Sequence, residues 1–219
     1  MSKIKSGNPA VSLIRPLQDK VRFGLVFQSI RYRLMRCGLE FTPYYLMQEG
    51  INLVTKIPVI HGRQDEYSLE FLGAEDMNIV ALNSGLSEEK PHYFLKTGQK
   101  CLGLKHMGEI AAYLWINLNE IDFASLKIPL KNNEAYLLEM CTIDSYKGKN
   151  LAPYLRYKSY EILKEMGREV LYSVSVCFNT PTIRCKKKLN AKELKLLLYI
   201  ELFHKYRRGF TYTISFGLR

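Results

Sequence analysis

The sequence predicts an α/β fold, in which a mixed sheet is flanked by helices and preceded by a basic helical N-terminal extension. Three observations support this prediction. Residues 134–143 form an apolar run of strand length, a helical pattern follows over 151–166, and a second apolar strand comes at 170–176. Strand patterns occur both before and after this central unit. A chain of 219 residues, of which 47% are hydrophobic, is long enough to bury the core of such a fold.

Residues 1–65 are interpreted as the N-terminal extension, and residues 66–219 as the main domain. Over 17–37, apolar residues recur at helical spacing while arginine and lysine occupy the rest of the helix surface. A basic amphipathic helix of this kind suits peripheral contact with an anionic membrane or an acidic protein. The alternative is a helix that packs on its own domain with solvated arginines. A linker containing Pro58 and Gly62 then leads to the boundary.

The elements between residues 66 and 133 are predicted from hydrophobic pattern and turn residues. They comprise a strand over 67–72, a helix that begins at 73–76, a loop with a short second helix over 83–98, and a hairpin formed by 100–105 and 109–117. The stretch 117–133 is polar and irregular, so we interpret it as a link to the central unit.

The central unit contains a candidate phosphate site between its first strand and its helix. Asp144, Ser145 and Gly148 end the strand with turn residues, and Lys147 and Lys149 flank the turn. A helix start carries unpaired N–H groups and a partial positive charge, so a turn here favours an anion. The residues alone allow either a phosphorylated ligand or an ordinary turn with solvated lysines.

The chain after the central unit is predicted to form one short helix and two strands. Thr180 and Pro181 are typical of an N-cap and a first helical residue, and Asn190 suits a left-handed helix end. Strand patterns follow over 194–203 and 210–216, around a basic turn.

Two segments of the sequence resemble motifs of the GNAT superfamily of acyl-CoA-dependent N-acyltransferases. The family's phosphate turn, Arg/Gln-x-x-Gly-x-Gly/Ala, aligns with residues 147–152, where lysine replaces the first residue and asparagine the fourth. The second segment begins at Asn179 and keeps the family spacing to Leu189, with Lys186 at the position of the family's general-acid tyrosine. The resemblance covers residues 67–216 and implies a GNAT-like central twisted sheet.

The resemblance implies that the protein transfers an acyl group from acetyl-CoA or another acyl-CoA to an amine or hydroxyl of a small-molecule acceptor, by direct attack. The diphosphate would bind to main-chain N–H groups of the turn, and the pantetheine arm would lie along the strand that ends at Thr142. The acyl carbonyl would point into a splay between that strand and 170–176. The implied cofactor-binding residues are Thr142, Lys147, Gly148, Lys149, Asn150, Leu151, Ala152 and Asn179.

Such a reaction requires a base for the nucleophile and an acid or a positive charge for the leaving thiolate. Glu139 is the first candidate base because it lies in an otherwise apolar strand, where burial would raise its pKa. Glu134 is the second candidate, and either carboxylate could instead face water. Lys186 could act as an acid if burial lowers its pKa, but we favour an electrostatic role toward phosphate.

The net charge of +11 predicts an anionic partner, which could be a CoA-like cofactor, an acidic lipid surface or nucleic acid. A competing hypothesis is therefore a non-enzymatic binding module for nucleic acid or an anionic membrane surface. Nucleic acid is disfavoured because few aromatic residues accompany the basic ones and no zinc finger is present. With the same fold, the protein could also be a pseudo-enzyme, or an acyltransferase whose donor is an acyl carrier protein.

Cysteines and histidines give no sign of a disulfide framework or a metal site. Five cysteines are scattered without a CxxC pair, and four histidines show no ligand spacing. No apolar run reaches the roughly 20 residues that span a bilayer. These features favour a cytoplasmic protein, with membrane-peripheral contact through the basic helix left open.

Overall fold

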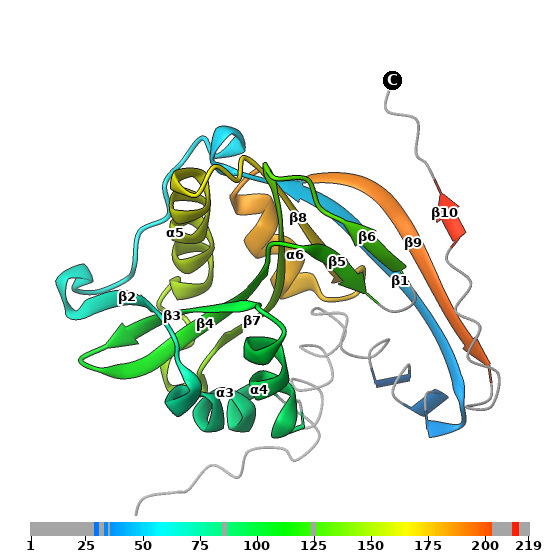
Figure 1. Cartoon of the computed structure of the whole chain (residues 1–219), viewed down its shortest axis with the longest axis horizontal. Helices are drawn as coiled ribbons and strands as arrows, with labels where there is room; N and C mark the ends of the chain where they lie inside the picture. Colours follow the sequence, from blue (N-terminus) through cyan, green and yellow to red (C-terminus); the bar gives the residue numbers. More distant parts are fainter. Residues whose placement is uncertain are drawn as a thin grey trace, which may run out of the picture.

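The computed structural model describes residues 29–30, 33–34, 36–84, 87–123, 126–202 and 212–214. Its centre is an eight-stranded sheet with the order β10-β9-β1-β8-β7-β4-β3-β2 (Figure 1). The strands are β1 (Leu39–Glu49), β2 (Tyr67–Phe71), β3 (Lys100–His106), β4 (Glu109–Asn117), β5 (Glu120–Phe123), β6 (Leu126–Pro129), β7 (Glu134–Thr142), β8 (Val170–Val176), β9 (Lys192–Leu202) and β10 (Tyr212–Ile214). The helices are α3 (Met77–Ser84), α4 (Glu89–Lys96), α5 (Leu151–Glu165) and α6 (Thr180–Lys188), with 3-10 turns at 51–53, 64–66, 74–76 and 144–146.

The sheet is mixed because β7 and β8 run parallel, whereas every other pair of neighbouring strands among the described residues is antiparallel. Helix α5 connects β7 to β8, as a parallel pair requires. The mixed α/β fold predicted from the sequence is confirmed.

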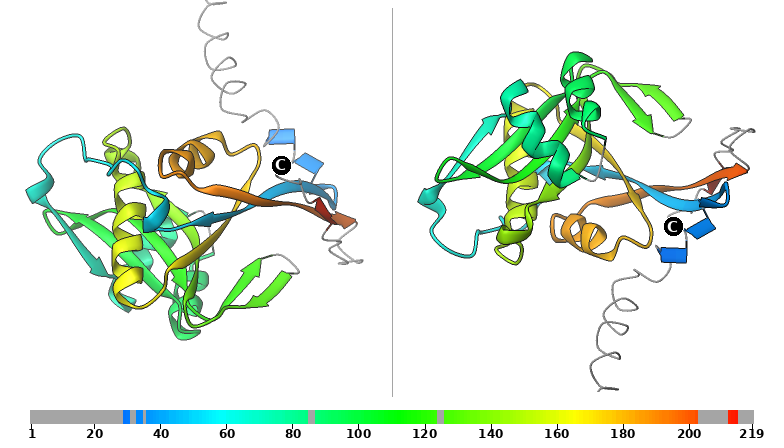
Figure 2. Two further views of the ribbon diagram at one scale, coloured as in Figure 1. Left: turned by 90° about the horizontal axis from the view of Figure 1, so that it is seen from above. Right: turned by 90° about the horizontal axis from the view of Figure 1, so that it is seen from below.

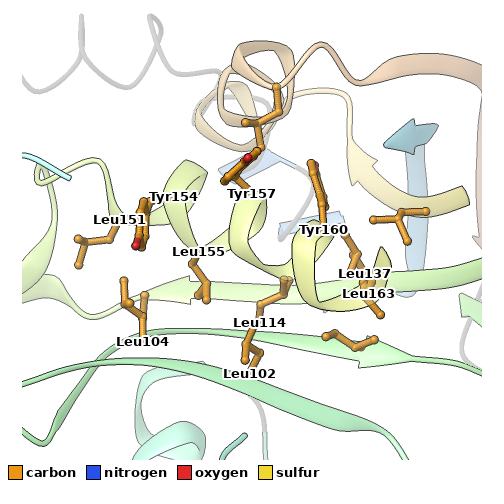
Figure 3. Packing of buried hydrophobic residues seen from close by; sticks show 14 of the residues in the cluster. Leu102, Leu104, Leu114, Leu137, Leu151, Tyr154, Leu155, Tyr157, Tyr160 and Leu163 are labelled. Carbon is orange, nitrogen blue, oxygen red and sulfur yellow. The ribbon is translucent and has the colours of Figure 1, made fainter. Parts of the chain in front are cut away.

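Helix α5 packs on one face of the sheet and forms the main core. Leu151, Leu155 and Leu163 are buried there against leucines of β3, β4 and β7 (Figure 3). Tyr154, Tyr157 and Tyr160 are buried as well, so α5 is covered on most of its circumference and not only on the sheet side. The element that follows β7 is therefore held firmly in place.

Helices α3 and α4 pack on the opposite face of the sheet. Figure 2 shows them on the other side from α6. Met77 and Val80 of α3 and Phe94 of α4 are buried against Trp115 and Tyr113 of β4. Trp115 is fully buried and makes an edge-to-face contact with Phe94, so it is a core residue.

Strand β1 lies near the centre of the sheet, between β8 and β9, and is antiparallel to both. It falls within residues 1–65, which the sequence pattern assigns to an N-terminal extension. Part of that region thus contributes a strand to the sheet. Of the helix predicted over 17–37, the structure describes residues 29, 30, 33, 34 and 36, which are helical, and Cys37, which lies in a turn. The remainder lies outside the described residues.

Strands β5 and β6 form a separate two-stranded hairpin in the stretch 117–133, which we expected to be irregular. Ile121 of β5 is buried against Tyr44 and Tyr136 of the main sheet. Because only a few apolar residues anchor the hairpin, the sequence shows only a weak alternation of apolar and polar residues in this stretch. Among the residues that the structure describes, no helix has the length and apolar character needed to cross a bilayer.

Candidate active site

The turn between β7 and α5 has a backbone conformation that its residues allow. Gly148 and Asn150 have φ angles of 84° and 61°, in the left-handed region where glycine and asparagine are most readily accepted. Asparagine at position 150 therefore preserves the turn although the GNAT motif has glycine there. Helix α5 begins immediately afterwards, at Leu151.

The start of α5, all of it within the described residues, has no side-chain cap and no acidic residue in its first turn. The side chain of Asn150 is used elsewhere, because its Nδ2 donates to the Val59 carbonyl oxygen (2.7 Å) and its Oδ1 accepts from Lys188 Nζ (3.2 Å). The N–H groups of the first turn thus have no side-chain acceptor from the capping residue, which is the condition under which a helix start binds an anion.

A cavity of about 590 Å³ lies against this helix start. It is bounded by the end of β7, the turn, the first residues of α5, and α6. Six of the eight predicted cofactor-binding residues line it, namely Thr142, Lys147, Gly148, Asn150, Leu151 and Ala152. The structure thus brings most of the predicted cofactor-binding residues together around one cavity.

The other two predicted residues do not line the cavity. The Lys149 ammonium lies 5.0 Å from the centre of the Tyr146 ring. Asn179 caps α6, where its side chain accepts a hydrogen bond from the Thr182 N–H (3.3 Å). Thr182 itself lines the cavity. Asn179 therefore supports a residue of the cavity wall without lining the cavity.

Strands β7 and β8 pair only at their beginnings. The ladder runs from Glu134 and Val170 to Tyr136 and Tyr172, although β7 continues to Thr142 and β8 to Val176. Within the described residues, no other strand pairs with this edge of β7 beyond Tyr136. A splay of the kind expected from the sequence is therefore present, and it leads toward the cavity-lining Met140.

Glu139, the first candidate base, is the extra residue of a β-bulge in β7. Leu138 pairs with Trp115 and Met140 with Leu114, which leaves Glu139 unpaired, with a φ of 37°. Its side chain is exposed, not buried as the argument for a raised pKa assumed. Glu139 does not line the cavity, although the next residue, Met140, does.

Glu134, the second candidate base, lies at the opposite end of β7. Its carboxylate accepts hydrogen bonds from the Lys131 N–H (2.9 Å) and the Tyr172 hydroxyl (3.2 Å). Glu134 does not line the cavity. Its hydrogen bonds instead stabilise the start of the parallel pair formed by β7 and β8.

Lys186 does not line the cavity, and its ammonium points into the protein. Nζ donates to the hydroxyls of Ser173 (2.6 Å) and Ser175 (2.5 Å) and to the Val174 carbonyl oxygen (3.4 Å). It lies 3.7 Å from a carboxylate oxygen of Glu49. The proposed electrostatic role toward phosphate does not fit this enclosed position, and the structure corrects it.

Glu49, at the end of β1, is the centre of this buried cluster. Its carboxylate is held by Arg156 of α5, through Nε (2.5 Å) and Nη2 (2.8 Å). The hydroxyls of Tyr160 and Ser173 also donate to it. One carboxylate therefore joins β1, α5, β8 and α6 behind the cavity.

The cluster shifts the pKa values of its members. Burial would raise the pKa of Glu49, but Arg156 and Lys186 overcome this effect and lower it from 4.5 to about 2. Burial lowers the pKa of Lys186 from 10.5 to about 7, although Glu49 opposes the change. The cluster thus contains one firmly ionised carboxylate and one lysine that titrates near neutral pH.

Sequence reasoning missed Glu49 and Arg156. Arg156 could have been found, because it shares the i, i+4, i+7 face of α5 with Tyr160 and Leu163, where a charge needs a buried partner. The partner could not, since Glu49 lies 107 positions away in the chain.

Comparisons with known proteins bear on the fold. No family model matches the sequence. No curated protein matches it either. Solved structures do match: a Drosophila protein (TM-score 0.55, 18% identity, covering 84% of this chain and 59% of that one) and an acetyltransferase from the GNAT family of Colwellia psychrerythraea (TM-score 0.55, 14% identity, covering 75% and 58%). A candidate GNAT-family acetyltransferase from Novosphingobium aromaticivorans has a TM-score of 0.52 and 21% identity, and the match covers 76% of this chain and 67% of that one.

These similarities show that the chain has the fold of the GNAT N-acetyltransferases. The fold implied by the sequence motifs is confirmed. The chain spans less than two thirds of the length of the Drosophila and Colwellia proteins.

Proposed function

We propose that the protein is an acyltransferase that transfers an acyl group from a CoA thioester to an amine or hydroxyl acceptor. The observation that carries the proposal is the cavity of about 590 Å³, which joins an uncapped helix start to the splay between β7 and β8. The helix start suits a diphosphate, and the splay suits an extended thiol-bearing arm.

The residues present fit such a donor. Lys147 and Lys188 line the cavity, and Asp144 is the only acidic residue among the described ones that line it. Asp144 lies 2.5 Å from Lys147 on the exposed surface, where an ion pair is weak and can be exchanged for a phosphate. The unpaired edge of β7 offers main-chain groups to the amides of a pantetheine arm.

A bound CoA thioester supplies an activated acyl carbon, and the chain has to align the acceptor and remove its proton. We assign proton removal to Glu139, because the β-bulge places it next in the chain to Met140, which lines the cavity, whereas Glu134 lies at the other end of β7. An exposed carboxylate can return the proton to solvent after each turnover. Replacing Glu139 by Gln should therefore slow the reaction without weakening donor binding.

The test of the proposed donor site is Ala152→Asp. This change places a carboxylate at the start of α5, where it would repel a diphosphate and satisfy the free N–H groups itself. Thermal shift with acetyl-CoA, longer acyl-CoAs and DNA should show stabilisation of the native protein by the CoA esters and none by DNA. Ala152→Asp should abolish that stabilisation.

Asn132→Asp is the matched control, since it adds the same charge at an exposed turn before β7, away from the cavity. It should leave the CoA-dependent shift unchanged. Equal shifts in the native protein and Ala152→Asp would contradict the proposed site, and stabilisation by DNA alone would favour a nucleic-acid-binding module.

A further inference from the structure

Two serines of β8 lie along the open part of the splay between β7 and β8. Ser173 and Ser175 follow Tyr172, the last residue of β8 that pairs with β7. Counted from that last pair, Ser175 is three positions along β8, and Met140 is three positions along β7 once the bulged Glu139 is left out. Ser175 is therefore at the level of Met140, which lines the candidate donor cavity, on the other side of the splay.

The side chain of Lys186, from α6, ends between these two serines. Its Nζ is 2.6 Å from Ser173 Oγ and 2.5 Å from Ser175 Oγ. Ser173 is fully buried, and its hydroxyl donates to the Glu49 carboxylate. The Ser175 hydroxyl accepts from Lys186 and donates to none of the described residues, and Ser175 is 6% exposed. Of the two serines, Ser175 is thus the one whose proton is not already committed to a carboxylate.

Lys186 can take a proton from a hydroxyl only when its amine is neutral. Burial lowers the pKa of Lys186 to about 7, and the positive charge of Arg156 acts in the same direction. The other ionisable groups that act on it are the Glu49 carboxylate on β1 and the thiol of the neighbouring Cys185, both of which oppose the change. Glu49 and Arg156 form their own ion pair, so the buried charges remain balanced when Lys186 loses its proton.

We propose that Ser175 and Lys186 form a nucleophile and base pair, which accepts the acyl group of a thioester in the splay and passes it to water when no acceptor is bound. This activity is thioester hydrolysis through an acyl-serine. It goes beyond the proposed function, on which it rests for the position of the thioester. A serine with a lysine base recurs among hydrolytic enzymes of unrelated folds.

The pair completes the reaction in two steps. In the first step, Ser175 Oγ bonds to the acyl carbon and its proton moves to the neutral Nζ of Lys186. The C–S bond then breaks, and the leaving thiolate takes that proton, which leaves an ester on Ser175. In the second step, water attacks the ester carbon and gives a proton to Nζ. The C–O bond to Ser175 breaks, and Oγ takes the proton back as a carboxylic acid is released.

The experiment is acid-quenched peptide mass spectrometry of the full chain after incubation with acetyl-CoA and no acceptor, together with the rate of thiol release. We expect an acetyl group on the peptide that contains Ser175. Thiol release should rise as the pH increases through about 7 and then level off. Ser175→Ala should lose the acetyl group and slow thiol release.

Two substitutions of Lys186 separate a base from a structural cation. Lys186→Met removes the charge and leaves the ion pair of Glu49 and Arg156 in place, so the variant should fold. Lys186→Arg keeps the charge but cannot accept a proton at neutral pH. Both should slow thiol release by about 10²- to 10⁴-fold. Recovery of the native rate in Lys186→Arg would show that the lysine only holds the structure, and would overturn the pair.

Ser159→Ala is the matched control, because Ser159 is a fully buried serine of α5 whose hydroxyl donates to the Arg156 carbonyl oxygen (2.7 Å). It should keep both the acetyl group on Ser175 and the native rate. Thermal shift with acetyl-CoA reports donor binding separately for each variant. An unmodified Ser175 in a native protein that acetyl-CoA still stabilises, or undiminished thiol release in Ser175→Ala, would overturn the pair and leave the proposed function in place. Absence of both the acetyl group and the stabilisation would overturn both.

Discussion

Glu139 lies on β7, which borders the splay, and Glu49 lies on β1, on the other side of β8. The two carboxylates have opposite surroundings. Glu49 is buried and is held by Arg156, Lys186 and two hydroxyls. Glu139 is exposed, and in its bulge it has no ladder partner among the described residues. The buried cluster fixes four elements behind the cavity, whereas the exposed carboxylate is free to exchange protons. The comparison separates residues that build the site from residues suited to act in it.

The largest expected effect comes from Glu49→Gln. This change leaves Arg156 and Lys186 buried without their anion, which costs about 3–5 kcal/mol of unfolding free energy. Urea unfolding at pH 7 measures the loss. The matched variant Asp144→Asn breaks an exposed ion pair with Lys147 and should cost less than about 1 kcal/mol. Similar losses of unfolding free energy in the two variants would show that burial of an ion pair does not raise the cost of breaking it.

Acid should weaken the native protein through Glu49. Its pKa is about 2 in the folded protein and 4.5 ordinarily, so its stabilising contribution is complete above pH 4.5 and is lost as the pH falls toward 2. The contribution is on the order of 3 kcal/mol. Unfolding free energies measured between pH 5 and pH 2 should fall less steeply in Glu49→Gln than in the native protein. Parallel curves would mean that Glu49 keeps its proton affinity on folding.

The smallest effect on stability is expected for Glu139→Gln, which should stay within about 0.5 kcal/mol of the native protein. Its effect should appear in catalysis, as a roughly 10²- to 10⁴-fold lower rate of CoA release with a panel of amines. Glu134→Gln, on the same strand, should retain the native rate. If Glu134→Gln is the slower variant, the assignment of the base has to be reversed.

The local pattern of apolar and turn residues was sufficient to predict the part of the fold that forms the candidate donor site. The apolar runs of β7 and β8, the helical spacing of α5 and the turn residues Gly148 and Asn150 are all contiguous features, and the structure has them where they were expected. The GNAT motifs lie in the same stretch, so most of the predicted cofactor-binding residues line one cavity.

The remaining features depend on partners that are distant in the chain. The contacts of Glu49 with Arg156, Tyr160 and Ser173 span 107, 111 and 124 positions. No periodicity in the sequence reports such a pairing, which is why the pattern puts β1 in an extension and Lys186 near the phosphate. The exposure of Glu139 was missed for a related reason, since a bulge depends on the register with β4.

The central position of β1 has a consequence for biosynthesis. This eleven-residue strand is translated long before β8 and β9, the two strands that flank it in the sheet. Until those strands leave the ribosome, β1 has neither neighbour, and unpaired strand edges readily join other chains. The sheet therefore cannot close until β8 and β9 have been translated, and a product that stops before them would expose β1 to association with other chains.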